Sequence, residues 1–176
     1  MVLTLTQLAR YTLEAYFQNQ KFEPDEETKK KYSDKKACFV TLTKNDQLRG
    51  CVGSLIATQE LWKDVQENAI NAAFRDSRFP PLTKEELNKI KIEISVLTAP
   101  KKLEYENEKD LLEKINKDMG IILKKGFYSA TFLPQVWEQL PDKIQFLEHL
   151  SLKAGLDKDA WKTADIFYYK VEIEKE

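Results

Sequence analysis

The sequence has few of the residues on which metal and thiol chemistry depends, with 2 cysteines and 1 histidine among 176 residues. Cys38 and Cys51 do not form a CxxC pair, which argues against a structural zinc site. No cysteine triad is present that could bind an iron–sulfur cluster. The sequence therefore predicts no resident metal or cofactor. Two cysteines without an export signal predict a reducing cytoplasm, in which disulfides do not persist.

Neither sign of charge is in large excess, because the chain has 28 basic and 29 acidic residues. The chain therefore lacks a global field that would gather nucleic acid or anionic lipid. Its lysine-rich segments are interleaved with acids and offer no aromatic stacking platform, which leaves RNA or nucleotide binding as the weakest functional hypothesis. No apolar run is long enough to span a bilayer, and residues 1–17 lack the features of a signal peptide.

The length and a hydrophobic content of 42% fit one globular domain over residues 1–176, with a connection near residues 99–108. The residue patterns predict helices over about residues 5–19, from 59 to before 80, near 109–116 and from 143 to 154. They predict hairpins over residues 37–56 and around 125–126, and strands over 90–97 and 165–172. Residues 20–36 are interpreted as a solvated connection. Hairpin connections favour an α+β fold with mainly antiparallel sheet flanked by helices.

Local signals mark several of these elements. Thr4 with Gln7 and Thr83 with Glu86 form possible capping boxes, the second for a short helix, and Gly155 is suited to the left-handed position after the last helix. Helical spacing predicts an apolar stripe in the first helix, formed by Leu5, Leu8, Ala9, Thr12 and Tyr16, and one in the last, formed by Ile144, Leu147, Ser151 and Ala154. Apolar and polar residues alternate over 90–97, which is typical of a half-buried strand.

The stretch "LRGCVGSL" places two glycines around a thiol inside a predicted strand. A turn between Lys44 and Gln47 would set Val40 opposite Cys51, and Cys38 opposite Gly53. The two cysteines would then be diagonal neighbours on one face, about 7 Å apart. A change in register by one residue would move them to opposite faces.

Cys51 is the candidate nucleophile, since a thiolate attacks where a thiol does not. Arg49, two positions away, would stabilise the thiolate or a developing oxyanion. Gly50 and Gly53 would let a ligand approach the sheet closely. The alternative is that Cys51 is a small buried hydrophobe.

A second candidate group follows the predicted helix that ends before Pro80. Arg75, Asp76 and Arg78 could bind a carboxylate or phosphate, with Asp76 orienting an arginine. The alternative is an internal ion-pair network that fixes this turn. Asn68 interrupts the small-residue face of the helix and is a secondary pocket candidate, because a buried amide needs partners.

Thr131 is a further binding candidate, because it stands beside Phe132 in "TFLPQVW". The alternative is a strand end followed by Pro134 in a first helical turn, with Trp137 packed inward. His149 falls away from the apolar stripe of its predicted helix and is interpreted as a surface residue.

Several ordered blocks resemble the AMMECR domain family. "LRGCVG" is similar to the family signature LRGCIG, and the likeness continues through "FVTL", "AAFRDSRFPPLT", "EISVLT", "TFLPQVWEQL" and "LKAGL". The resemblance implies a mixed α/β fold with two lobes and a cleft. It also implies a relation to protein A of the AmmeMemoRadiSam system, with a Memo-like protein and a radical SAM enzyme as partners. Many members have a histidine before the strand that begins at Gly120, where this chain has Met119.

Two main hypotheses follow. The first is an accessory or substrate-binding component that acts with Memo-like and radical SAM partners and takes a small molecule or peptide. The second is a cysteine-dependent enzyme that uses Cys51, in which Met119 removes a histidine base. The sequence leaves open whether the chain is an enzyme.

Overall fold

The structure, a computed structural model, describes residues 1–176 and divides into two compact units. The first unit comprises Met1–Ala99 and Glu172–Glu176, and the second comprises Pro100–Val171. Each unit contains an antiparallel sheet of four strands. The predicted α+β fold is confirmed, and the second unit is an insertion between two segments of the first.

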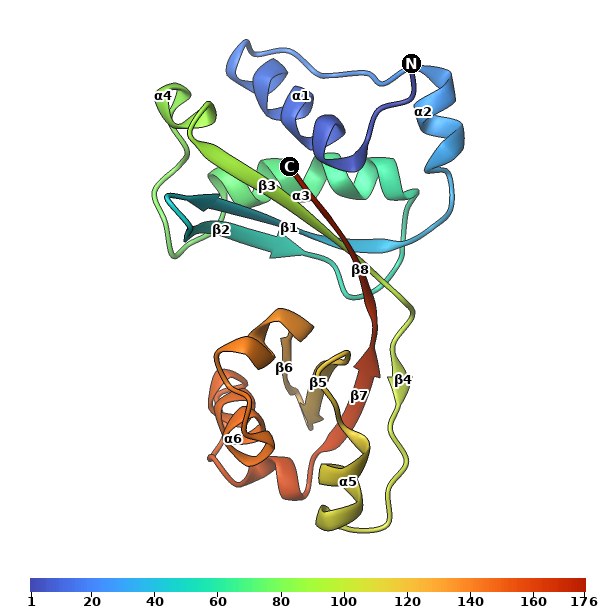
Figure 1. Cartoon of the computed structure of the whole chain (residues 1–176), viewed down its shortest axis with the longest axis vertical. Helices are drawn as coiled ribbons and strands as arrows, with labels where there is room; N and C mark the ends of the chain where they lie inside the picture. Colours follow the sequence, from blue (N-terminus) through green and yellow to red (C-terminus); the bar gives the residue numbers. More distant parts are fainter. The chain divides into compact units, whose positions relative to one another are not determined.

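The first unit has two long helices, α1 (Leu5–Phe17) and α3 (Leu61–Phe74), on one face of its sheet. The strand order is β2 (Gln47–Gly53), β1 (Ala37–Lys44), β3 (Ile90–Leu97) and β8 (Val171–Lys175). The helices are α1 (Leu5–Phe17), α2 (Glu26–Lys31), α3 (Leu61–Phe74) and α4 (Lys84–Leu87). Helix α3 packs on β1 and β2, and α1 packs on α3 and β3 (Figure 1). The core of the unit lies between these helices and the sheet.

Local sequence signals set the ends of these elements. Helix α1 begins at the predicted capping box, in which Thr4 accepts from the Gln7 N–H and the Gln7 side chain accepts from Thr4. Strand β3 alternates as predicted, with Ile92 and Ile94 turned inward. The predicted apolar stripe of α1 is buried except at Tyr16, which is 40% exposed.

The prediction of a solvated connection over residues 20–36 was wrong, because this segment contains α2. Asp25 caps the helix by accepting from the Thr28 N–H at 2.7 Å. Thr28 is buried and its hydroxyl accepts from the Leu3 N–H at 3.1 Å. The helix has 6 residues, which is too short for a periodic apolar pattern to reveal it.

The turn between β1 and β2 was predicted correctly, but the register was not. Asn45 and Asp46 both have positive φ, 52° and 61°, as a two-residue hairpin turn of type I′ requires. A bulge then follows, because Leu48 pairs with Thr43 whereas Gly50 pairs with Leu42. Arg49 is the extra residue, and it moves the rest of β2 by one position.

This bulge separates the two thiols. Cys51 pairs with Thr41 instead of Val40, and Gly53 pairs with Phe39 instead of Cys38. Cys38 is fully buried on the α3 side, whereas Cys51 lies on the opposite face and is half-buried. The predicted diagonal contact between the cysteines is therefore wrong.

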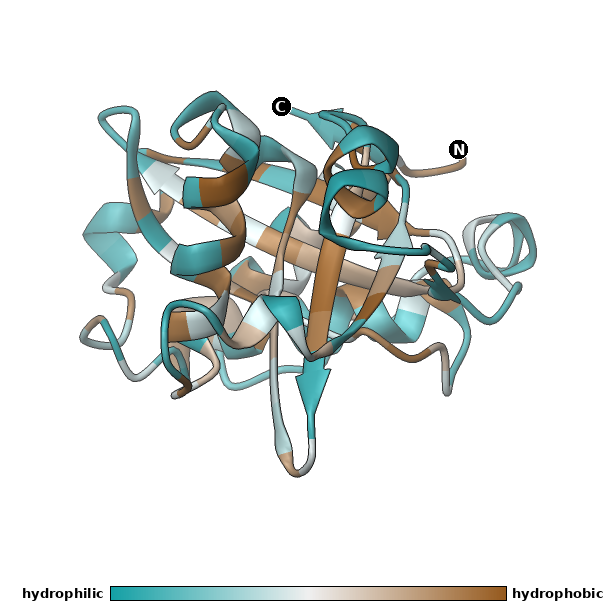
Figure 2. Cartoon of the chain, turned by 90° about the horizontal axis from the view of Figure 1, so that it is seen from below, coloured by the Kyte–Doolittle hydropathy of each residue, from teal (hydrophilic) through white to brown (hydrophobic).

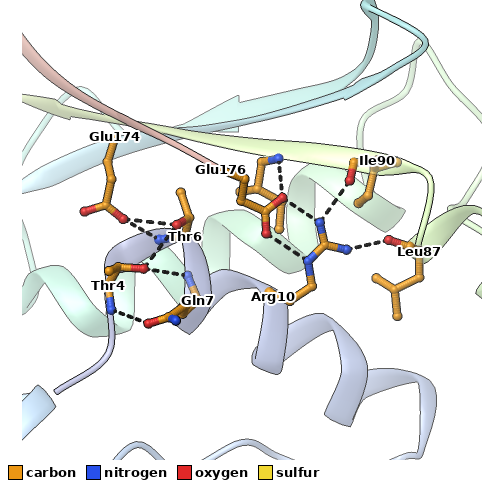
Figure 3. Close-up of polar contacts among 9 residues, drawn as sticks. Thr4, Thr6, Gln7, Arg10, Leu87, Ile90, Glu174 and Glu176 are labelled. Atoms are coloured by element: carbon orange, nitrogen blue, oxygen red, sulfur yellow. Dashed lines mark hydrogen bonds and ion pairs between the residues drawn. The ribbon is translucent and has the colours of Figure 1, made fainter. Parts of the chain in front are cut away.

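The predicted final strand over 165–172 is two strands, β7 (Asp165–Tyr169) in the second unit and β8 in the sheet of the first. Residues of and beside β8 tie α1 to the sheet (Figure 3). The Glu174 carboxylate accepts from the N–H and hydroxyl of Thr6 at 2.8 and 3.2 Å. Glu176 pairs with Arg10 at 2.6 Å, and Arg10 also donates to the carbonyls of Leu87 and Ile90.

The second unit has the strand order β4 (Lys101–Lys102), β7, β5 (Gly120–Lys125) and β6 (Tyr128–Phe132). Its helices are α5 (Glu108–Lys114), α6 (Lys143–Lys153) and the 3₁₀ helices Pro134–Glu138 and Ala160–Lys162. Hydrophobic and hydrophilic residues are interspersed along the helices of the chain, as expected of helices with one apolar face (Figure 2). Trp137 is buried as the alternative interpretation of "TFLPQVW" predicted, and its ring stacks on Phe146 at 3.7 Å.

Helix α6 differs from its prediction in its buried stripe but not at its end. Gly155 follows its end with a φ of +81°, as predicted. Ile144 was expected in the buried stripe but is 45% exposed, whereas Phe146 is buried. No helix of the chain is both long enough and apolar enough to cross a bilayer.

Candidate functional site

Asp76 connects the end of α3 to β2. Its Oδ2 accepts from the Cys51 N–H at 3.0 Å and from Arg78 Nη2 at 2.8 Å. Its Oδ1 accepts from the backbone N–H and the Nε of Arg78 at 3.1 and 3.0 Å. The forked Arg78 contact and these backbone donors lower the pKa of the Asp76 carboxyl to about 2. Asp76 is therefore a buried, ionised anchor that fixes Arg78 beside Cys51.

Arg78 is the cation of this site. Its side chain is 56% exposed even though Asp76 holds two of its nitrogens. Nη2 also donates to the Cys51 carbonyl at 3.3 Å, and the guanidinium lies 5.4 Å from the centre of the Phe79 ring. Nη1 makes no hydrogen bond within the chain, so this oriented group can donate to a ligand.

Cys51 lies in a row of polar residues that crosses three strands. Its Sγ is 3.2 Å from Oγ1 of Thr41, the residue opposite it on β1. Thr41 is in turn opposite Glu93 on β3, and Glu93 pairs with Lys175 at 3.3 Å. Directly opposed residues share a face of a sheet. The row therefore places a thiol, a hydroxyl and a carboxylate on the face that α3 does not cover.

Arg49 is not in this row. Its Nε and Nη2 donate to the two carboxylate oxygens of Glu86 at 3.0 Å, and Nη2 also donates to the Pro80 carbonyl at 2.9 Å. Arg49 is 8% exposed, and its fork holds the pKa of the Glu86 carboxyl well below its usual range. The bulge thus directs the Arg49 side chain to α4. Arg78 occupies the position beside Cys51 that was predicted for Arg49.

Both glycines of the motif are required by packing within the first unit. A Cβ on Gly50 would lie 2.1 Å from the Ala72 carbonyl oxygen of α3. A Cβ on Gly53 would lie 2.2 Å from the Phe39 ring and 2.6 Å from the Cys38 carbonyl oxygen. The close approach that the glycines indicated is therefore made by the unit's own helix, backbone and aromatic ring.

Asn68 belongs to a buried network on the α3 side of the sheet. Its amide donates to Asp64 at 3.0 Å and to the Cys38 carbonyl and Ser54 hydroxyl at 3.3 Å. Asp64 also accepts from the Cys38 N–H at 2.9 Å. Burial and the charge of Asp64 raise the pKa of the Cys38 thiol. Asn68 thus ties α3 to the start of β1 and the end of β2.

The other predicted residues make no hydrogen bond or ion pair with the Asp76 carboxylate and have partners of their own within their units. Arg75 is exposed and donates to the Asn71 side chain at 3.1 Å. Thr131 is in the second unit, where its hydroxyl bonds Tyr169 at 2.8 Å and donates to the Ile121 carbonyl at 2.9 Å. Met119 packs on the core of the second unit. His149 is exposed, as predicted.

The sequence-based predictions missed Thr41 and Glu93. Only the strand register identifies them, and the bulge at Arg49 hides that register. No three histidine, cysteine, aspartate or glutamate side chains come together in an arrangement that could hold a metal ion. The chemistry that the site itself offers is that of a thiol with a neighbouring hydroxyl and an oriented guanidinium.

Comparisons with known proteins agree with the residue pattern. The AMMECR1 family model matches residues 6–174. Protein NEQ441 of Nanoarchaeum equitans is 40% identical over 99% of both chains, and protein Mbar_A1807 of Methanosarcina barkeri is 42% identical over 96% of this chain and 87% of its own. The crystal structure of the uncharacterized protein PH0010 from Pyrococcus horikoshii is similar with a TM-score of 0.91 and 34% identity, covering 98% of this chain and 89% of that one. The chain therefore belongs to the AMMECR1 family.

Proposed function

We propose that the chain is a cytoplasmic accessory or substrate-binding component that acts with a Memo-like protein and a radical SAM enzyme. Its working surface is the face formed by Cys51, Thr41 and Arg78. The resemblance to the AMMECR domain family supports the partners. The observation that carries the binding role is the Arg78 guanidinium, which Asp76 fixes in place while its Nη1 has no partner within the chain.

The geometry favours a ligand with a carboxylate or phosphate group. Asp76 compensates the charge of Arg78, so the pair attracts an anion less than an isolated arginine would. It supplies direction instead, because a guanidinium held by a fork presents its remaining N–H groups in a fixed plane. The partly exposed Cys51 lies beside this donor. A small molecule or peptide with one acidic group fits this arrangement.

Arg78→Ala is expected to weaken binding to the Memo-like partner by about tenfold, which corresponds to one lost charge-assisted hydrogen bond. The measurement is a quantitative pull-down of the purified partner by the full chain. Arg75→Ala is the matched control, because Arg75 is an exposed arginine near the same helix end that bonds only Asn71. Equal binding by the Arg78→Ala variant and the wild type would contradict the proposed surface.

A second function, cysteine-dependent catalysis, is favoured by the 3.2 Å contact between Cys51 Sγ and the Thr41 hydroxyl. In that function Cys51 is the nucleophile, and Arg78 takes the role that was predicted for Arg49. Arg78 interacts electrostatically with Cys51, and a neighbouring cation favours the thiolate. Met119 is half-buried, and its thioether cannot act as a base.

Iodoacetamide is expected to alkylate Cys51 in the native protein while leaving Cys38 unmodified. Cys38 is fully buried, and its raised pKa suppresses the thiolate. Arg78→Gln should slow the alkylation of Cys51 at pH 7 by roughly tenfold, because it removes the cation beside the reacting sulfur. Mass spectrometry of each cysteine peptide over time measures both rates. If Cys51 reacts as slowly as Cys38, the nucleophile role is ruled out.

A further inference from the structure

The first unit contains a cavity of about 320 Å³ between the end of α1, the segment that follows it and the first half of α3. Its volume is within the range of small-molecule sites. These helices cover the sheet face that carries Gly50, whereas Cys51 is on the other face. The cavity is therefore separate from the Cys51 surface.

The wall of this cavity is held by the fold. Asn19 ends α1 with a φ of +56°, and the Gln20 N–H donates to the Ala15 carbonyl at 2.9 Å. This turn brings Phe22 back toward α3. The Phe22 carbonyl then accepts from Gln66 Nε2 at 2.9 Å. Hydrogen bonds therefore hold the segment after α1 in place as one wall of the cavity.

Gln66 presents an acceptor whose orientation is fixed. Its Nε2 donates to the Phe22 carbonyl and, at 3.1 Å, to the Thr12 hydroxyl, which itself donates to the Leu8 carbonyl. A flipped amide would place its oxygen against the Phe22 carbonyl oxygen, so the assignment is settled by these partners. Oε1 makes no hydrogen bond within the chain and is not fully enclosed. It can accept from an N–H group of a ligand.

Aromatic rings supply the apolar surface. Trp62 and Phe22 line the cavity together with Tyr16, whose ring stacks on Phe74 at 4.5 Å. Trp62 is 7% exposed, and its buried Nε1 lies beside the Glu60 carboxylate, which also pairs with Lys63 at 2.6 Å. The aromatic rings therefore offer apolar surface to a flat ligand ring.

Among the charged side chains that line the cavity, one lysine has no ion-pair partner. Lys63 is paired with Glu60, and Glu67 accepts from Gln59 at 2.7 Å. Lys21 also lines the cavity, is exposed and makes no ion pair. An anionic group at the mouth would complement Lys21.

We propose that this cavity binds a small planar heteroaromatic carboxylate. A ring N–H of the ligand donates to Gln66, the ring lies between Trp62 and Phe22, and the carboxylate pairs with Lys21. This site is independent of the proposed function of the Cys51 surface. Neither proposal depends on the other.

Indole-3-acetate is the probe, because it combines a planar ring, one N–H group and a carboxylate. Titration of the ¹⁵N-labelled chain should give saturable shifts, and Trp62 should be the one tryptophan whose indole resonance moves, since Trp137 and Trp161 are in the other core. 1-Methylindole-3-acetate lacks the donor and indole-3-acetamide lacks the charge. Each should bind at least about fivefold more weakly, the effect of about 1 kcal/mol.

Two variants locate the site. Ile70→Trp fills the cavity and should abolish saturation, whereas Ile56→Trp, at a residue that is 70% exposed and outside the cavity, should not. Lys21→Glu changes an exposed side chain and should weaken indole-3-acetate at least fivefold while leaving indole-3-acetamide unchanged. The proposal is overturned if no saturable shift occurs or if the shifts map to residues outside the cavity. It is also overturned if Lys21→Glu binds indole-3-acetate as tightly as the wild type does and both analogues bind the wild type as tightly as indole-3-acetate.

Discussion

Gly50→Ala is expected to lower the free energy of unfolding of the first unit by about 3 kcal/mol or more, the upper range for an overpacked interior. The added Cβ would lie 2.1 Å from the Ala72 carbonyl oxygen. That atom belongs to the backbone of α3, so the whole helix must move away from β2. Urea denaturation, followed by the indole NMR signal of Trp62, measures the loss in this unit.

Gly126→Ala is the control for this substitution. Gly126 has a φ of +61° but no atom within 4 Å of an added Cβ. Gly126 is in the second unit, so its replacement should cost that unit only the strain of a left-handed conformation, about 1 kcal/mol, and should leave the stability reported by Trp62 unchanged. The indole signals of Trp137 and Trp161 measure the loss in the second unit. If Gly50→Ala unfolds at the same urea concentration as the wild type, α3 does not approach β2 this closely.

Asp76→Asn is expected to lower the free energy of unfolding by about 2 kcal/mol at pH 7, and this difference should disappear as the pH falls from about 4 to about 2. The folded pKa of Asp76 is about 2, below its ordinary value of 3.8, and the side chain is 6% exposed. A lowered pKa contributes stability that is complete above the unfolded pKa and is lost through the folded one. Urea denaturation of both proteins at pH 7, 4, 3 and 2 tests this dependence.

Asp34→Asn serves as the control, because Asp34 is exposed and its carboxylate makes no hydrogen bond or ion pair. Its effect should stay below about 0.5 kcal/mol at every pH. Glu86 also has a lowered pKa, so the wild type itself loses stability in acid. The difference between the wild type and Asp76→Asn removes that common contribution. A difference that stays constant down to pH 2 would show that charge is not what Asp76 supplies.

Much of the fold could be predicted because its signals are local. The capping boxes that begin at Thr4 and Thr83 and the alternation of β3 each depend on neighbouring residues. The two-residue turn at Asn45 and Asp46 is equally local. By contrast α2, with 6 residues, is too short to show a period, and β8 was merged with β7 because nothing local marks a change of sheet.

The candidate site was predicted in its residue types but not in its arrangement. Asp76 and Arg78 do lie beside Cys51, whereas Arg49 does not. The difference comes from one extra residue in β2, since a bulge changes the pairing of every later position without a distinct sequence signal. Gly50 was interpreted as space for a ligand because the sequence does not show that α3 fills that space.

The insertion of the second unit between β3 and β8 has a consequence for biosynthesis. Residues 100–171 are contiguous and can fold as soon as they leave the ribosome. The first unit must wait, because Glu174 and Glu176 are made after the whole second unit, and until then Thr6 and Arg10 lack these carboxylate partners. The first unit contains the N-terminal residues, which are synthesised first. Even so, it can reach its final structure only after the whole second unit has been translated.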